Sequence, residues 1–380
     1  MLNQAALEYI DAHAEEAYEL LTTLAQIPAP SNHEERRMEF CKSWLTACNA
    51  RGVYTDSAYN VVYPCGVEEG APVVVFMAHM DVVFPDTDPL PLKVEEDRIF
   101  CPGIGDDTAN LAALLLAARY VTEKCLTPQG PGILFVCNAG EEGLGNLKGS
   151  KKICEDYAGR IKAFYSFDGT MAGVVNRAVG SARFRVWVRT EGGHSYGCFG
   201  RPNAIGVLAR IISKIYEIEV PGEGKTTYNV GTVQGGTSVN TIAQEASMLC
   251  EYRSDREEGL AYMKERFQTL FHAFWGNGVE VETELVGLRP CEHLEKEQEK
   301  LRLKMVEQAC ERLKRITGRE PKKGPSSTDC NIPLSMGIPS VCFGAYFGDG
   351  AHTREEYVER SSLKAGYEVV FESILSYFEE

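Results

Sequence analysis

Residues 73–81 read VVVFMAHMD, and this stretch decides how we interpret the rest of the chain. Its first six residues are apolar without a break, which is typical of a strand buried on both faces of a sheet. The run then ends in two ionisable side chains, His79 and Asp81. The stretch therefore predicts an α/β sheet covered by helices on both sides, with polar groups at a strand end.

Similar apolar runs recur along the chain, at 133–136 (ILFV), 163–167 (AFYSF) and 340–343 (SVCF). Segments whose apolar residues have helical spacing separate several of them, among them 110–120 and 296–315. This alternation of strands and helices predicts a mixed, mostly parallel sheet with helices on both faces.

Two helices are expected before the first of these strands. Apolar residues at helical spacing from Ile10 to Leu24 predict one continuous helix, which Pro28 would end. A second helix should begin at Ser31, because Ser31 and Glu34 have the spacing of a capping box.

The pattern changes between residues 177 and 288. The segment 182–190 (ARFRVWVRT) alternates, with valines on one face and arginines on the other, which predicts a strand with one solvated side. A helix, two strands, a second helix and a last strand follow, and this β-α-β-β-α-β order is that of a ferredoxin-like unit. We therefore expect an inserted domain at 177–288 within an α/β domain made of residues 1–176 and 289–380.

The composition of the sequence excludes several classes of protein. The chain has 54 acidic and 39 basic residues, and the resulting net charge of −15 disfavours binding to nucleic acid or to anionic membranes. The 13 cysteines are odd in number and form no C-x-x-C motif, as is typical of reduced thiols in the cytoplasm. The N-terminal stretch is acidic and helical rather than a secretory signal, and no apolar stretch approaches the roughly 18 residues of a membrane span. We expect a cytoplasmic protein.

Ionisable side chains follow every predicted strand of the α/β sheet. In chain order they are His79 and Asp81, the pair Glu141 and Glu142, Asp168 and, after a glycine-rich loop, His352, with Asp106 and Asp107 before a predicted helix. Each alone is typical of an ordinary turn or helix cap. Ligands of open α/β sheets bind beyond the carboxyl ends of the strands, where these groups would repel one another without a cation. Two histidines with several carboxylates suit Zn²⁺, with Mn²⁺ or Co²⁺ as alternatives.

Seven segments carry a resemblance to a known family: MAHMDVVF, GIGDD, NAGEEGLGN, YSFDGT, GGHSYGCFGRPNAI, GGTSVNTIA and AHTREEYV. In this order they are similar to the co-catalytic dizinc metallopeptidase superfamily that contains peptidase T, carboxypeptidase G and aminoacylase. The SFDG and AHTREEYV segments are most similar to the peptidase T branch. The sequence departs from the pattern at Thr108-Ala109-Asn110, where many relatives have lysine, or methionine and lysine, followed by glycine.

The resemblance implies a ligand set for two divalent metal ions per subunit. His79, Asp106 and Asp168 would bind one ion. Asp106, Glu142 and His352 would bind the other, so that Asp106 bridges the two. Two ions roughly 3.5–4 Å apart need such a shared anionic ligand and can share a bridging water.

The resemblance also implies roles for residues outside the ligand set. Glu141 would be the general base that activates the bridging water, and Asp81 would fix the ring of the neighbouring ligand histidine. His194 would stabilise the oxyanion, reaching from the inserted domain into the active site of a partner subunit. Asn240 and Arg253 match positions that bind the substrate's backbone or carboxylate, and a structural salt bridge is the alternative role of Arg253.

These observations predict a zinc-dependent exopeptidase for short peptides, most similar to an aminopeptidase that acts on di- or tripeptides. An N-acyl-amino-acid deacylase or carboxypeptidase with the same chemistry is the alternative. The insert at 177–288 would serve as a lid and as the contact of a homodimer.

Two other kinds of protein are weaker alternatives. Residues 193–197 (GHSYG) fit the G-x-S-x-G motif of a serine hydrolase, with Ser195 as nucleophile and Asp329 and His352 completing a triad. The arginine-rich strand before the motif and the lack of a helix directly after it argue against that reading. A scaffold that has lost catalysis is disfavoured by the presence of Glu141 and of the full ligand set.

Overall fold

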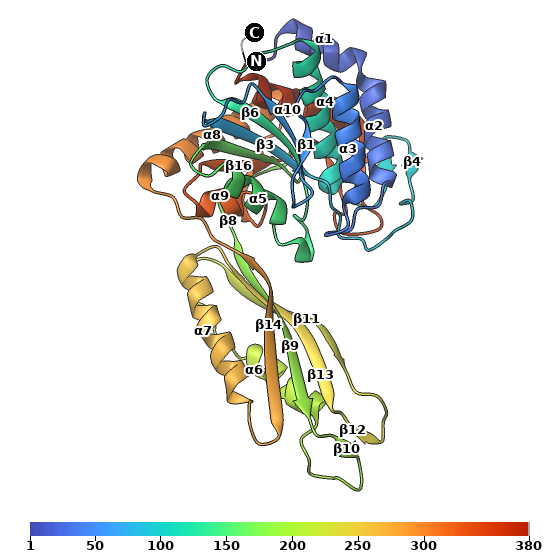
Figure 1. Ribbon diagram of the computed structural model, residues 1–380, viewed down its shortest axis with the longest axis vertical. Helices are drawn as coiled ribbons and strands as arrows, with labels where there is room; N and C mark the ends of the chain where they lie inside the picture. Colours follow the sequence, from blue (N-terminus) through green and yellow to red (C-terminus); the bar gives the residue numbers. More distant parts are fainter. Residues whose placement is uncertain (379–380) are drawn as a thin grey trace. The chain divides into compact units, whose positions relative to one another are not determined.

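The computed structural model describes residues 1–378 and divides the chain into two compact units (Figure 1). The α/β unit comprises Met1–Ala178 and the chain from His293 on, and the inserted unit comprises Val179–Glu292. Among the helices of residues 1–378, none combines the length and apolar character that a bilayer crossing requires.

The α/β unit is built around an eight-stranded sheet with the order β1-β2-β6-β3-β7-β16-β8-β15. The central strands β6, β3, β7 and β16 run parallel to one another, whereas β2 is antiparallel to β6 and β8 is antiparallel to β16. The strands of this sheet are β1 (Tyr54–Thr55), β2 (Val61–Cys65), β3 (Val73–His79), β6 (Gly132–Asn138), β7 (Ile161–Phe167), β8 (Gly173–Ala178), β15 (Lys322–Ser326) and β16 (Ser340–Phe343). A smaller antiparallel sheet contains β4 (Lys93–Glu95), β5 (Arg98–Phe100), β17 (Gly348–Asp349) and β18 (Tyr357–Glu359).

Helices cover both faces of this sheet, as predicted. They are α1 (Gln4–Ala12), α2 (Ala14–Gln26), α3 (Glu35–Ala47), α4 (Asn110–Glu123), α5 (Lys148–Asp156), α8 (Lys296–Thr317), α9 (Asn331–Ser335) and α10 (Leu363–Leu375). Successive residues of β3 point to opposite sides: Val74 and Phe76 enter one core with α4 and α10, and Val73 and Val75 enter another with α5 and α9. Burial on both faces explains why the strand is continuously apolar.

The N-terminal predictions need two corrections. The expected single helix is two, α1 and α2, because the chain leaves helical geometry at His13, whose ring stacks on Tyr9 and bonds the Tyr9 carbonyl at 2.8 Å. The expected capping box at Ser31 is also wrong. The Ser31 hydroxyl donates to Asp81 Oδ2 at 2.7 Å, and the next helix, α3, begins only at Glu35.

The inserted unit has the predicted β-α-β-β-α-β order. Its main elements are β9 (Gly180–Thr190), α6 (Ala204–Ile215), β11 (Thr226–Gly235), β13 (Glu245–Ser254), α7 (Glu257–Ala273) and β14 (Val279–Arg289), and the short strands β10 (Gly193–His194) and β12 (Thr241–Ile242) form a separate pair. The antiparallel sheet order β11-β13-β9-β14 is that of a ferredoxin-like unit.

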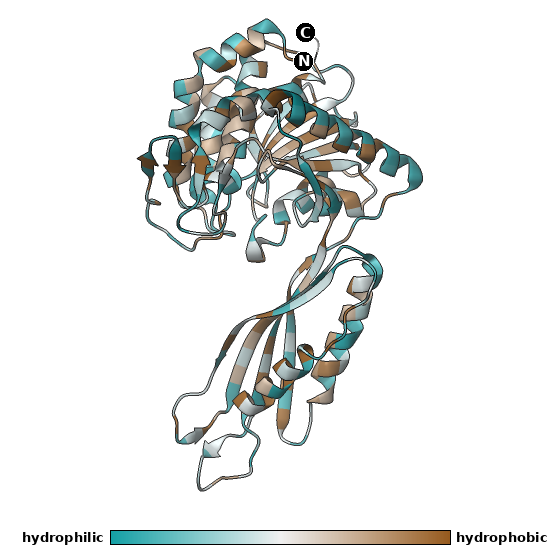
Figure 2. Ribbon diagram, turned by 180° about the vertical axis from the view of Figure 1, so that it is seen from behind, coloured by the Kyte–Doolittle hydropathy of each residue, from teal (hydrophilic) through white to brown (hydrophobic). Residues whose placement is uncertain are grey.

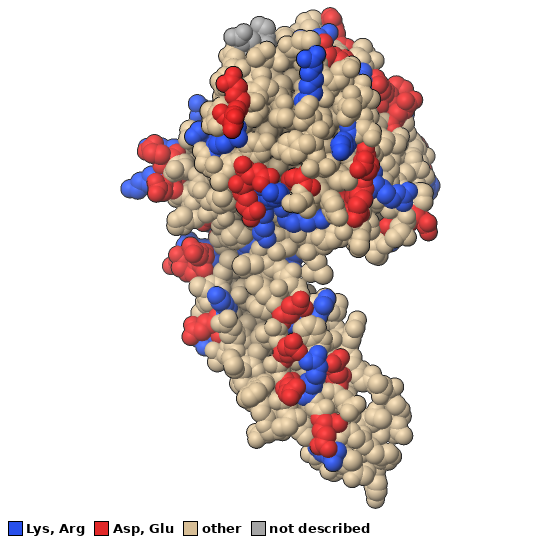
Figure 3. All heavy atoms as spheres, viewed as in Figure 1, with Lys and Arg blue, Asp and Glu red and all other residues tan. Residues whose placement is uncertain are grey.

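One face of the inserted sheet is covered and the other is solvated. Val186 and Val188 of β9 are buried against α6 and α7, and the hydropathy colours alternate along these strands in Figure 2. Along α6, Val207 is buried against the sheet whereas Ile205 is exposed. On the solvated face, Arg189 pairs with Glu245 at 2.9 Å. Acidic and basic side chains are interspersed over the surface seen in Figure 3.

Candidate active site

Seven ionisable side chains gather at the carboxyl ends of the central strands. Three overlapping groups each have ligand atoms within 4.8 Å of one another: His79, Asp106, Asp107 and Asp168; His79, Glu141 and Glu142; and Asp106, Glu142 and His352. Four of them come together because β3, β6 and β7 are parallel, so that their carboxyl ends share one edge of the sheet. The segment before α4 and the loop after β17 bring the other three, Asp106, Asp107 and His352, to the same edge. All the ligand candidates of the sequence therefore occur in one cluster.

Asp106 lies at the centre of the cluster, between the two histidines. Its Oδ1 is 3.1 Å from Nε2 of His79, and its Oδ2 is 3.1 Å from Nε2 of His352. The same His352 nitrogen is 2.9 Å from Glu142 Oε1. One carboxylate thus offers one oxygen to each half of the cluster, which is the arrangement that a bridging ligand needs.

The pKa values of the cluster reflect crowded negative charge. Burial and the nearby Asp106 raise the pKa of Asp168 well above its ordinary value, and burial raises the pKa of Glu142 to about 7. Burial also opposes the ionisation of Asp106, but hydrogen bonds from His352 and His79 outweigh it and hold the pKa of Asp106 below its usual range. Repelling, buried carboxylates beside the imidazole nitrogens of His79 and His352 fit a divalent cation, which would supply the missing positive charge.

Asp81 organises the backbone around this cluster. Its Oδ1 accepts from the N–H of Glu141 and its Oδ2 from the N–H of Glu142, both at 2.9 Å. The hydrogen bond to His79 Nδ1, expected from the Asp81 carboxylate, is made instead by the Asp81 backbone carbonyl at 3.0 Å, with the carboxylate at 3.5 Å. Because Nδ1 faces this carbonyl, Nε2 is the ring nitrogen that faces the cluster.

Two buried residues that we did not select from the sequence hold the backbone on either side of the cluster, Glu356 at the loop that carries Asp106 and Arg37 at the end of β3. Glu356 accepts hydrogen bonds from the N–H groups of Gly103, Gly105 and Asp106 at 2.7, 2.8 and 2.7 Å. Arg37 is fully buried and donates to the Met80 carbonyl at 2.8 Å, between His79 and Asp81. Arg37 follows another arginine in a charged helix, and Glu356 lies 250 residues from Asp106, so no local signal marks either residue.

Within the inserted unit, the structure brings His194 and Asn240 together. The strand of His194, β10, pairs with β12, and the N–H of Ser195 donates to the Asn240 carbonyl at 2.9 Å. Arg253 lies near the other end of β13, seven residues and so roughly 24 Å along the strand from Ala246, which lies at the end nearer to Asn240 in the chain. Its guanidinium donates to Glu251 at 2.7 Å, the salt bridge considered as its alternative role.

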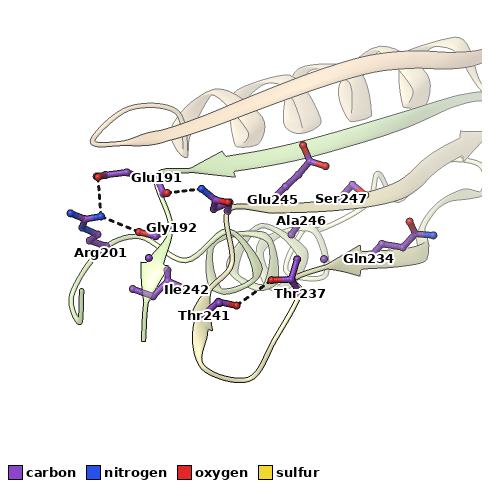
Figure 4. Close-up of a pocket in the computed structure, with 14 residues that line it drawn as sticks. Glu191, Gly192, Arg201, Gln234, Thr237, Thr241, Ile242, Glu245, Ala246 and Ser247 are labelled. Atoms are coloured by element: carbon purple, nitrogen blue, oxygen red, sulfur yellow. Dashed lines mark hydrogen bonds and ion pairs between the residues drawn. The ribbon is translucent and has the colours of Figure 1, made fainter. Parts of the chain in front are cut away.

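A polar cavity of about 590 Å³ adjoins the His194 and Asn240 loops (Figure 4). Arg201 spans one side of it, paired with Glu191 at 2.8 Å and donating to the Gly192 carbonyl at 3.2 Å. Ser195 follows β10, and α6 begins only at Ala204. The strand–turn–helix geometry of a serine-hydrolase nucleophile is therefore not formed at this position.

The α/β fold with a ferredoxin-like insert, and the histidine and carboxylate cluster at its strand ends, define the class of the protein as a metallopeptidase. Comparison with family models agrees with this class. The model described as peptidase family M20/M25/M40 matches residues 75–376, and the chain belongs to that family. The resemblance found in the sequence is confirmed.

The relatives with curated names do not share one named activity. The chain is 25% identical over 372 residues to the uncharacterized protein YqjE of Bacillus subtilis, covering 91% of this chain and 94% of the relative. It is 25% identical over 351 residues to a succinyl-diaminopimelate desuccinylase of Corynebacterium glutamicum, covering 89% and 90%. A probable carboxypeptidase of Aspergillus terreus is 25% identical over 249 residues, covering 59% and 57%.

Solved structures share the fold of this chain. A tripeptidase from Staphylococcus aureus has a TM-score of 0.72 at 22% identity, covering 94% of this chain and 98% of the other. The aminopeptidase PepT from Bacillus cereus has a TM-score of 0.68 at 23% identity, covering 94% and 97%. These likenesses confirm the predicted fold class.

Proposed function

We propose that the protein is a two-metal exopeptidase that hydrolyses short peptides, acting as an aminopeptidase on di- or tripeptides. The observation that carries this proposal is the position of Asp106, with one oxygen 3.1 Å from His79 and the other 3.1 Å from His352. The names of the tripeptidase and the aminopeptidase that share the fold support the choice of short peptides.

Two sets of residues would hold the ions, with Asp106 common to both. His79 and Asp168 complete one set, and Glu142 and His352 complete the other. The mixture of imidazole and carboxylate donors favours Zn²⁺, with Mn²⁺ and Co²⁺ as alternatives. Divalent ions bound there would polarise the scissile carbonyl and lower the pKa of water.

Glu141 would act as the general base. It is buried beside His79 and Glu142, and its backbone N–H is held by Asp81 Oδ1 at 2.9 Å. A carboxylate at this position can take a proton from the attacking water and pass it to the leaving amine. Asp81 would thereby position both the base and Glu142.

The inserted unit would complete the site. We assign His194 to the oxyanion and Asn240 to the substrate's backbone, since the two loops lie together. Arg253 would bind a substrate carboxylate only after leaving Glu251, which it contacts at 2.7 Å. The unit would also form the homodimer contact through which His194 serves a partner subunit, a role that light scattering showing a monomer would exclude.

Replacing Glu141 by glutamine tests the proposed base. We expect Glu141→Gln to keep its bound ions and to lose about 10²–10⁴-fold in turnover, because it cannot accept the proton. Metal analysis and kcat measured on the same preparation separate the two effects. Wild-type turnover by the variant would exclude Glu141 as the base.

A second candidate function, deacylation of N-acyl amino acids, is favoured by the desuccinylase relative, which matches 89% of this chain. Ala-Ala-Ala, its N-acetyl derivative and an N-acyl amino acid, each assayed with added Zn²⁺, Mn²⁺ or Co²⁺, discriminate the two. An aminopeptidase cleaves only the free tripeptide, because the acetyl group removes the terminal ammonium. Cleavage of the N-acyl amino acid alone would replace our first proposal by the second.

A further inference from the structure

Asn110, the first residue of α4, joins three segments that are distant in the sequence. It is fully buried, and its Nδ2 donates to Asp107 Oδ1 at 2.6 Å and to the Gly169 carbonyl at 3.0 Å. Its Oδ1 accepts from the N–H of Ala345 at 2.6 Å. The loop before α4, the turn after β7 and the loop after β16 therefore meet on one amide.

These contacts lie next to the proposed metal ligands. Asp107 follows Asp106 in the chain, and Gly169 follows Asp168. A buried amide bonded at both of its ends has a single orientation, so the segments that it joins are held at a fixed spacing.

Asp107 extends this network to the fourth segment. Its Oδ2 accepts from the backbone N–H of His79 at 2.8 Å, while its Oδ1 accepts from Asn110. Its carboxylate also lies within 4.8 Å of ligand atoms of His79, Asp106 and Asp168, so distance alone leaves it a candidate ligand. Both of its oxygens already face buried N–H groups, which is the arrangement of a supporting carboxylate that orients ligands.

We infer that Asp107 and Asn110 form a positioning pair that fixes the spacing of His79, Asp106 and Asp168, and that Asp107 itself binds no metal ion. This inference rests on the proposed two-metal site. It also assigns a role to Asn110, which lies in the segment 108–110, where the sequence departs from the pattern of the family that it resembles. Without the amide, the three segments would lose their shared partner, and the ligands on them would have to be ordered by the metal.

The test compares metal binding by Asn110→Ala and Asn110→Asp with that of the wild type. Zn²⁺ affinity is measured by competition with a chelator, and the rise in Tm on adding Zn²⁺ gives a second measure. We expect both variants to bind two ions about 10–100-fold more weakly. Asn110→Asp keeps the shape of the side chain but places an oxygen against Asp107 Oδ1. Peptide turnover lost at limiting Zn²⁺ should return with excess Zn²⁺, which a misfolded variant would not show.

Asn60 offers a matched control in the same unit. It is also fully buried, and its amide donates to Asp56 at 2.6 Å and to Gly149 at 3.0 Å and accepts from Ala139 at 3.1 Å. None of these partners is adjacent in the chain to a proposed ligand. We expect Asn60→Ala to lower the Tm of the metal-free protein as Asn110→Ala does, but to leave the Tm rise on adding Zn²⁺ unchanged.

Asp107→Asn tests the second half of the inference. Two ions should remain, bound about 10–100-fold more weakly, whereas loss of one ion per chain would show that Asp107 is a ligand. Unchanged affinity in both Asn110 variants would overturn the positioning role and leave the proposed function standing. A wild-type protein that binds no metal would overturn the proposed function and this inference together.

Discussion

Replacing Asp81 by asparagine is the sharpest test of how the backbone of the active site is held. The Asp81 carboxylate is fully buried and accepts from the N–H groups of Glu141 and Glu142 at 2.9 Å each and from the Ser31 hydroxyl at 2.7 Å. Burial opposes its ionisation, but the adjacent His79 imidazole and the hydrogen bonds from Ser31 and Glu142 outweigh this effect and hold the pKa of Asp81 below its ordinary value. The carboxylate is therefore ionised at pH 7.

The size of the effect follows from the geometry. Asparagine has one oxygen, so its NH₂ group must face the N–H of either Glu141 or Glu142, and one buried donor loses its acceptor. A hydrogen bond to a charged group is worth about 1.5–3 kcal/mol, and the remaining bond weakens once the acceptor is neutral. We expect Asp81→Asn to lower the free energy of unfolding by about 2–4 kcal/mol at pH 7.

Urea unfolding of the metal-free protein measures this change. Of the three tryptophans, Trp187 and Trp275 lie in the inserted unit, so replacing both by phenylalanine leaves Trp44 as the fluorescence reporter of the α/β unit. Asp156→Asn is the control, because Asp156 forms an ion pair with Lys152 within one helix, and such pairs contribute only about 0.3–0.5 kcal/mol. A loss below about 1 kcal/mol in Asp81→Asn would refute the reasoning.

Three further predictions address the metal ligands and the inserted unit. His352→Ala should lower the occupancy of one of the two ion positions, and unchanged metal content after dialysis would contradict its role as a ligand. Because Asp106 and Glu142 raise the pKa of His352 to about 10, this histidine holds a proton at pH 7 that an ion must displace. The apparent affinity should therefore rise at least about tenfold per pH unit between about pH 6 and 8. Calorimetry in buffers of different ionisation enthalpy counts the released protons, and a count of zero would argue against this displacement. Phe267→Ala should destabilise the inserted unit by about 3–5 kcal/mol, because the ring is fully buried in the core of that unit. If the same variant also bound Zn²⁺ with an altered affinity, the two units would be coupled.

The sequence predicted the sheet and the gathering of its ligands because both follow from the parallel strands. Unbroken apolar runs such as 73–78 must be buried on both faces, and parallel strands bring their carboxyl ends to one edge. The capping box failed because Ser31 is held by a contact that the local pattern does not show: its hydroxyl donates to the Asp81 carboxylate, 50 residues along the chain, and α3 begins only at Glu35. The break at His13 involves neither glycine nor proline, so the sequence carries no usual signal for it.

The supporting residues could not be predicted, for a different reason. Glu356 and Arg37 act through contacts that span 250 and 43 residues of chain, respectively, and each has a charged side chain that is ordinarily exposed. In the sequence, Asn110 looks like an ordinary residue at a helix terminus. Only its hydrogen bonds with Gly169 and Ala345 in the folded chain show that it joins distant segments. Local patterns identify the ligands, whereas the groups that hold them are identified by the tertiary structure.

The pairing of β9 with β14 bears on how the inserted unit can be gained or lost in evolution. Ser181, where the chain enters the insert, is paired with Arg289, where the chain leaves it. Paired residues of antiparallel strands have their Cα atoms only about 4.5–5.5 Å apart, so one or two residues can bridge the gap. The insert can therefore be gained or lost in a single recombination event that leaves the strands of the eight-stranded sheet at their full length. A shortened gene that joins residue 181 to residue 289 through such a link would encode a continuous α/β chain with all five proposed metal ligands.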